Sequence, residues 1–183
     1  MRTTTTRTPL VLALTFAAAA AASCAKVEGD IPQAQVTQKS VNFQGFPGSK
    51  QIGEVSVTQS FTLTSADLSW AKELNSEVYA TEFELKAVGA VQDLSFIHYA
   101  HITMSDGTNG ATASAVEIVN YERPANAAPS PVIDAPTSYP INVSHVWAAE
   151  KVVITMVLAG VFPEDAWSAD VTLHMSGKMS YKF

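Results

Sequence analysis

The chain has 183 residues, of which 47% are hydrophobic and 15% are charged, and its formal charge is −6. Only 11 Lys and Arg residues oppose 17 Asp and Glu residues, which excludes the clustered basic surface that nucleic acid requires. One cysteine excludes an intramolecular disulfide, so packing of a hydrophobic core must stabilise the fold.

The first segment of the chain is typical of a secretory signal. Residues 1–9 carry Arg2 and Arg7 and no acidic residue, and an apolar, alanine-rich stretch follows over residues 10–22. This stretch is too short to span a bilayer as a helix of the mature protein. Removing residues 1–23 leaves 160 residues with nine basic and 17 acidic side chains, a formal charge of −8. This length suits one domain, and anionic lipid headgroups are poor partners for so acidic a chain.

Cys24 directly follows this stretch, in the run Ala21-Ala22-Ser23-Cys24-Ala25. The run resembles the lipobox of bacterial lipoproteins, in which a leucine-like residue and two small residues precede the cysteine that receives diacylglycerol; here Ala21 stands in the leucine place. The resemblance covers the first 24 residues. It implies a signal peptide over 1–23, lipidation of Cys24 and a membrane anchor of several acyl chains. Ala25 replaces the Asp that retains some lipoproteins at the inner membrane, which implies the outer membrane.

A second interpretation of this N-terminus stays open. Ordinary signal peptidase could cut after one of the alanines and leave Cys24 as a free thiol. Both interpretations export the chain. Residues 24–51 are then predicted to form the N-terminus and a flexible tether with a weak strand signal over 35–43, and residues 52–183 are predicted to form the folded domain.

Alternating apolar and polar residues predict strands through this domain. The clearest runs are 54–64 and 171–183, and the second is long enough that we expect a bend or bulge near Gly177. Residues 151–162 are apolar nearly throughout, as in a strand covered on both faces. Less regular runs predict four further strands, at residues 78–91, 94–104, 115–121 and 141–147.

The segments between these runs have their own signals. Residues 64–74 begin with a cap-like Thr and an Asp three residues later, which predicts a short helix, the only helix expected. Gln92-Asp93 is a short break that suggests a hairpin, and residues 105–110 form a glycine-containing turn. Residues 123–140 contain five prolines, which predicts a surface loop or an edge segment.

Many short strands and few helices predict an all-β fold, a single antiparallel two-sheet sandwich with an immunoglobulin-like outline and one short helix. The alternative is a small β-barrel, because Tyr181 and Phe183 match the ending of outer-membrane barrels. Eight membrane strands would leave too little chain for the proline-rich segment and the helix.

No constellation of residues predicts a cofactor or a metal site. His98 and His101 are three residues apart on an expected strand and should point to opposite faces, and His145 and His174 are scattered. Catalysis is not predicted either. Ser69 to Lys72 matches the Ser-x-x-Lys pattern of penicillin-recognising enzymes, but their other motifs are absent. Glu82 and Glu84 are predicted to lie on a solvated strand face. A cleft that brings a histidine beside a carboxylate would instead favour a hydrolase.

The tryptophans are the remaining candidates for a site. Trp147 ends an alternating run and is predicted to lie in the core. Trp70, on the predicted helix, and Trp167, in the loop before the last strand, are the candidates for a surface site that binds a protein or glycan partner. The alternative is that both cap the ends of the core.

These features predict a lipid-anchored β-sandwich of the bacterial cell envelope, held at the outer membrane and acting as a non-enzymatic binding, adhesion or structural module of unknown ligand. The alternative is a periplasmic accessory that carries an apolar ligand between its sheets or assists envelope assembly. A cavity between the sheets would favour the carrier, and a filled core with an exposed aromatic patch would favour surface binding.

Overall fold

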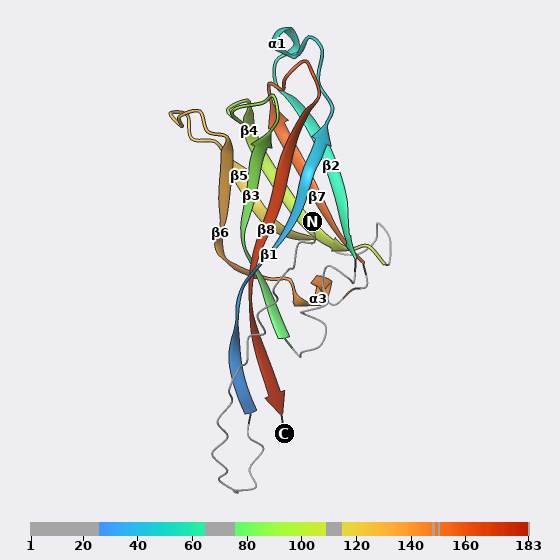
Figure 1. Cartoon of the computed structure of the whole chain (residues 1–183), viewed down its shortest axis with the longest axis vertical. Helices are drawn as coiled ribbons and strands as arrows, with labels where there is room; N and C mark the ends of the chain where they lie inside the picture. Colours follow the sequence, from blue (N-terminus) through green and yellow to red (C-terminus); the bar gives the residue numbers. More distant parts are fainter. Residues whose placement is uncertain (1–25, 65–75, 109–114, 148, 150, 183) are drawn as a thin grey trace, which may run out of the picture.

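The computed structural model describes residues 26–64, 76–108, 115–147, 149 and 151–182. These contain two antiparallel sheets, sheet A with the order β1-β8-β3-β6 and sheet B with the order β2-β7-β4-β5 (Figure 1). The predicted all-β sandwich is therefore confirmed. The strands are β1 (Lys26–Phe43), β2 (Val55–Thr64), β3 (Ser76–Val88), β4 (Ile97–Asp106), β5 (Val116–Glu122), β6 (Val132–Asn142), β7 (Lys151–Gly160) and β8 (Trp167–Lys182).

The strand order is that of a jelly roll. Strand β1 pairs with β8, β2 with β7, β3 with β6 and β4 with β5, so four antiparallel pairs are nested around the sandwich. This order differs from the immunoglobulin outline predicted from the sequence. The hairpin predicted at Gln92-Asp93 is also wrong, because β3 pairs with β8 while β4 pairs with β7 in the other sheet. Residues 89–96 instead cross from one sheet to the other.

Strand β1 corrects the predicted tether over residues 24–51. From Lys26 to Phe43 it is paired antiparallel with β8, so the folded domain begins near residue 26 rather than at residue 52. Its residues from Gln35 to Ser40 are exposed except for the half-buried Val36. A sheet-edge strand needs only one apolar face and benefits from charged and polar residues, so β1 lacks the pattern that marks a buried strand.

Two one-turn helices lie in the described residues, α1 (Ser49–Ile52) and α3 (Ser144–Trp147), so the expectation of a single helix is wrong. The strand predicted over 141–147 ends at Asn142, whose side-chain oxygen accepts a hydrogen bond from the Ser144 N–H at 3.0 Å and starts α3. The helix predicted over 64–74 lies outside the described residues, apart from Thr64 in β2. No described helix is long and apolar enough to cross a bilayer.

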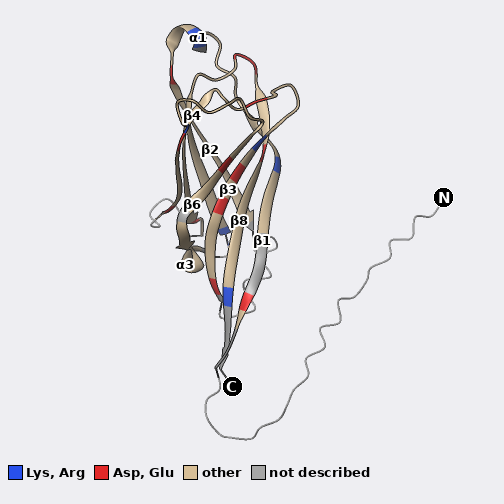
Figure 2. Cartoon of the chain, turned by 90° about the vertical axis from the view of Figure 1, so that its left-hand side faces the viewer, with Lys and Arg blue, Asp and Glu red and all other residues tan. Residues whose placement is uncertain are grey.

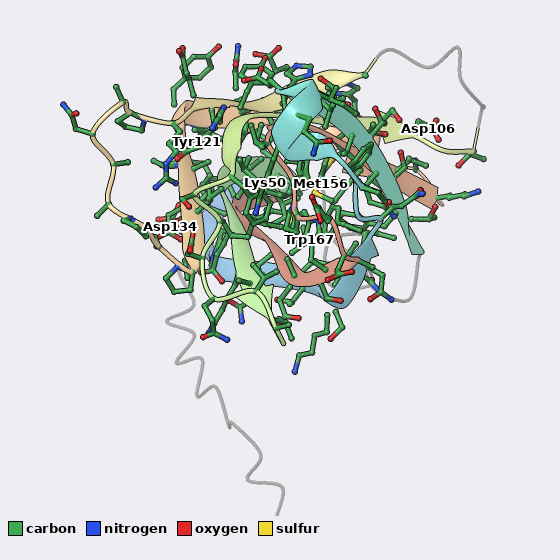
Figure 3. The ribbon with its side chains drawn as sticks, turned by 90° about the horizontal axis from the view of Figure 1, so that it is seen from above. Lys50, Asp106, Tyr121, Asp134, Met156 and Trp167 are labelled. Carbon is green, nitrogen blue, oxygen red and sulfur yellow. The ribbon has the colours of Figure 1, made fainter. Side chains whose placement is uncertain are left out.

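The core lies between the inner faces of the two sheets. Met156 of β7 is fully buried there, and in the view from above both Met156 and Trp167 lie inside the sandwich, while Asp106 and Asp134 lie at its periphery (Figure 3). The expectation that β7 is covered on both faces is wrong, because its outward residues, among them Val153 and Val157, are only half-buried. The proline-rich segment is confirmed as a loop followed by the edge strand β6.

Candidate functional site

The residues predicted to form sites are Cys24, Trp70 and Trp167, and the structure describes only the last of them. Cys24 and Trp70 lie outside the described residues. Trp167 is only 4% exposed, and its ring stacks on Phe43 with a centroid distance of 4.1 Å. The prediction that Trp167 belongs to an exposed site is therefore wrong. The segment before β8 is short, and it places Trp167, the first residue of this strand, against the end of the core. Trp167 therefore caps the core, which was the alternative left open from the sequence.

Trp167 belongs to an aromatic cluster at the end of the sandwich opposite the first residues of β1, here called the distal end. Phe96 meets the Trp167 ring edge-on at 5.0 Å, and Phe162 lies 6.2 Å from it. Two glycines allow the backbone to close around this cluster. A side chain at Gly160 would overlap the Phe96 carbonyl, and one at Gly45 would overlap the backbone at Glu164 and Asp165. These aromatic rings and close backbone approaches therefore fill the core at the distal end.

The histidines do not come together. The His98 side chain contacts Glu54 at 3.0 Å, and the His101 side chain contacts Glu117 at 2.8 Å. A bulge in β4 inserts His98 as an extra residue opposite β7, which shifts the alternation so that both histidines reach solvent rather than opposite faces. Among the described residues, no group of three His, Cys, Asp or Glu side chains could hold a metal ion.

A pocket at the distal end contains residue types that hydrolases use. It has a volume of about 390 Å³, and Ser95, His98 and Arg123 line it. The Ser95 hydroxyl donates to Asp93, whereas His98 holds Glu54, so the hydrogen bonds of this pocket do not join serine to imidazole. Arg123 donates to two backbone carbonyls of its own loop. These bonds fold the loops and leave no nucleophile and base in contact.

The Asp93 carboxylate beside this pocket is stabilised in its charged form by its neighbours. Hydrogen bonds from the Ser95 hydroxyl and the Ser95 N–H lower the pKa of Asp93, and the nearby charge of Arg123 acts in the same direction. The charged form is thereby favoured, as in a turn whose carboxylate caps the following residues.

A second pocket lies on the outer face of sheet A, toward the end where β1 begins and β8 ends. We call it the ribbon pocket, because β1 and β8 run on beyond the other strands at this end (Figure 1). Its volume is about 430 Å³. Charges of both signs lie on this part of β1 and β8 (Figure 2). The pocket is lined by Asp30, Tyr79, Pro140, Ser176, Gly177 and Lys178.

The ribbon pocket contains an ordered aromatic hydroxyl. The Tyr79 hydroxyl donates to a Glu77 carboxylate oxygen at 2.6 Å. This hydrogen bond, with a smaller contribution from desolvation, raises the pKa of Tyr79, so the phenol stays protonated. Beside Pro140, the Tyr139 side chain is 70% exposed. Neither tyrosine was a candidate from the sequence, because Tyr79 lies in a predicted strand and Tyr139 lies in the proline-rich segment.

No family model matches this chain, and no curated protein matches it. The chain is similar to several solved virus structures. The capsid protein of BFDV, crystallised as a decamer, is 10% identical with a TM-score of 0.38, covering 85% of this chain and 99% of that chain. The VP2 subviral particle of infectious bursal disease virus is 11% identical with a TM-score of 0.38 over 82% of this chain, which spans only 37% of VP2. Desmodium yellow mottle tymovirus is 10% identical with a TM-score of 0.34, covering 94% and 97% of the two chains.

Proposed function

We propose that this chain is a lipid-anchored binding module of the bacterial cell envelope, without enzymatic activity, that stands on the ribbon formed by β1 and β8. The observation that supports this most directly is the start of β1. It begins at Lys26, two residues after the Cys24 of the lipobox-like run, and it is paired with β8 along its length. An acyl anchor at Cys24 would therefore hold the folded domain with almost no intervening tether.

This placement sets the height of each part of the domain above the bilayer. At about 3.3 Å per residue, the 18 residues of β1 span about 60 Å. The distal end, with α1, would then lie farthest from the lipid, and the ribbon pocket would lie close to the lipid. Two or three acyl chains give an anchor strong enough to hold the domain there.

The core supports binding at the surface rather than transport of an apolar ligand. The inner faces of both sheets are filled by large side chains such as Phe83, Leu85 and Met156, each at most 1% exposed. Both pockets described above open on the outside of the sandwich, and charged residues take part in lining each of them. A carrier of apolar molecules needs an apolar cavity, and this arrangement favours a binding module over that alternative.

The height of the two ends can be measured with a fluorophore on an introduced cysteine. An acylated Cys24 has no free thiol, so a maleimide label at Lys178→Cys or at Lys50→Cys reports a single place. In vesicles that contain nitroxide-labelled lipid, we expect strong quenching at position 178 and little at position 50, which lies in α1 (Figure 3). Equal quenching at both positions, or labelling of Cys24 itself in the unsubstituted chain, would contradict the proposed anchor.

A further inference from the structure

We infer that the ribbon pocket is a binding site for a saccharide of one or two rings. The inference rests on the proposed binding role and names the ligand class, but it does not depend on the lipid anchor. The volume of about 430 Å³ lies in the range of small-molecule sites.

The backbone around the pocket departs from regular pairing on both sides of β8. Strand β1 has one extra residue between Ile31 and Ala34, opposite Gly177 and Met175 of β8. On the other side of β8, β3 has one extra residue, Thr81. Bulges of this kind re-aim side chains and gather at functional sites.

The third departure brings a proline to the pocket. Between Pro136 and Ile141, β6 has three more residues than the facing part of β3. The Thr137 hydroxyl donates to the Thr81 carbonyl at 3.0 Å, so the detour of β6 is fastened to the bulge of β3. This detour places Pro140 in the lining of the pocket, with the exposed Tyr139 next to it. The sheet is thus opened at the place where the pocket lies.

The side chains in the lining match a polyhydroxyl ligand. Asp30 accepts hydrogen bonds, Lys178 donates them, and the Ser176 hydroxyl does both. The Tyr79 hydroxyl already donates its hydrogen bond to Glu77, so toward a ligand hydroxyl the phenol oxygen acts as an acceptor. Sugar hydroxyls donate and accept in the same way, and each would find a complementary group here.

The apolar lining and the charge balance favour a neutral saccharide over a small ligand that carries charge of one sign. The ring of Tyr79 and the ring of Pro140 offer flat surfaces for the C–H face of a sugar. Asp30 and Lys178 face each other as register partners on β1 and β8, so the pocket combines one acidic and one basic group. A ligand that carries a strong charge of one sign would meet a group of its own sign, whereas a neutral sugar would not.

Saturation-transfer NMR on the full chain, in a detergent without a sugar headgroup, tests this inference. The probes are cellobiose, lactose and chitobiose at millimolar concentration. We expect saturation transfer to the ring protons of at least one disaccharide. Asp30→Asn should weaken that binding by about tenfold, the effect of losing one hydrogen bond to a charged group, and Tyr79→Ala should abolish it.

Matched variants separate the pocket from the rest of the surface. Asp134→Asn lies on the outer face of the same sheet and Tyr99→Ala on the outer face of the other sheet, and both should bind as the unsubstituted chain does. Asp30 is exposed, so Asp30→Asn keeps the test valid if Tyr79→Ala does not fold. The same signal is expected from Cys24→Ala, so failure of the anchor and failure of saccharide binding are distinct results. No transfer to any of the three disaccharides, transfer that survives both pocket variants, or transfer to phosphoethanolamine alone would overturn the inference.

Discussion

Replacing Gly160 with alanine should strongly destabilise the fold, because β7 and the segment before β4 approach closely there. Gly160 is buried at the end of β7 and pairs with Val55 on one side and Ile97 on the other. An added Cβ would overlap the Phe96 carbonyl, which accepts a hydrogen bond from the Val161 N–H at 3.0 Å. The obstacle is backbone, so no change of side-chain rotamer can relieve it, and the strands must move apart.

The cost has two parts. Moving the Phe96 carbonyl away breaks its hydrogen bond, at about 1–3 kcal/mol for groups left without a partner. Overpacking adds about 1–3 kcal/mol. We therefore expect a loss of about 4 kcal/mol, a large fraction of the roughly 5–15 kcal/mol that stabilises a typical domain. Gly89→Ala is the control, because nothing lies within 4 Å of its added Cβ and only its φ of 80° is unfavourable, at about 1–2 kcal/mol.

Urea unfolding followed by tryptophan fluorescence measures both variants. With a slope of about 2 kcal/mol per molar urea, the midpoint should fall by about 2 M for Gly160→Ala and by less than about 1 M for Gly89→Ala. Midpoints that agree, or a Gly160→Ala variant as stable as the unsubstituted chain, would refute the close approach of β7 to Phe96.

Two further predictions concern the distal end. Trp167→Ala should lower the free energy of unfolding, measured in urea, by about 3–5 kcal/mol. Trp167→Phe should lower it by less than half as much, because a ring is kept and the buried Nε1 has no hydrogen-bond partner to lose among the described residues. Equal losses of stability in the two variants would contradict this role of the ring. The pKa of Asp93 is lowered in the folded chain, so the stability it contributes is present above its unfolded pKa of about 3.9 and is lost as the pH falls through the lower folded value. Asp93→Asn should therefore flatten the dependence of the unfolding free energy on pH below about pH 4, and an unchanged acid limb would count against the Ser95 hydrogen bonds.

The sequence predicted the strands whose apolar residues alternate and missed what depends on pairing between distant segments. Strands β2, β7 and β8 follow the runs 54–64, 151–162 and 171–183, because burial of one face against the core leaves a direct signal. Strand β1 leaves almost none before residue 35, since it is held by its ladder with β8. The nested order of the strands could not be predicted, because a turn signal such as Gln92-Asp93 shows where a strand ends and not which strand it pairs with.

The ribbon pocket could not be predicted from the sequence either, because it also depends on pairing between distant segments. Its lining comes from four strands, and Asp30 and Lys178 meet only because β1 pairs with the end of β8. Part of the signal was present. A bulge was expected near Gly177, and the structure confirms one there, although the extra residue lies in the facing part of β1. The role of Trp167 could not be predicted from the sequence, because an aromatic residue just before a strand suits a surface site and a core cap equally well.

The anchor at Cys24 is tested most directly by the intact mass of the mature protein from membrane and soluble fractions, compared between the unsubstituted chain and Cys24→Ala. If Cys24 is lipidated, we expect a membrane-bound species that begins at Cys24 and is heavier by two or three acyl chains, and we expect this species to be lost in the variant. An unmodified chain in the soluble fraction, cut after one of the alanines before Cys24, would contradict the anchor and leave a free exported domain.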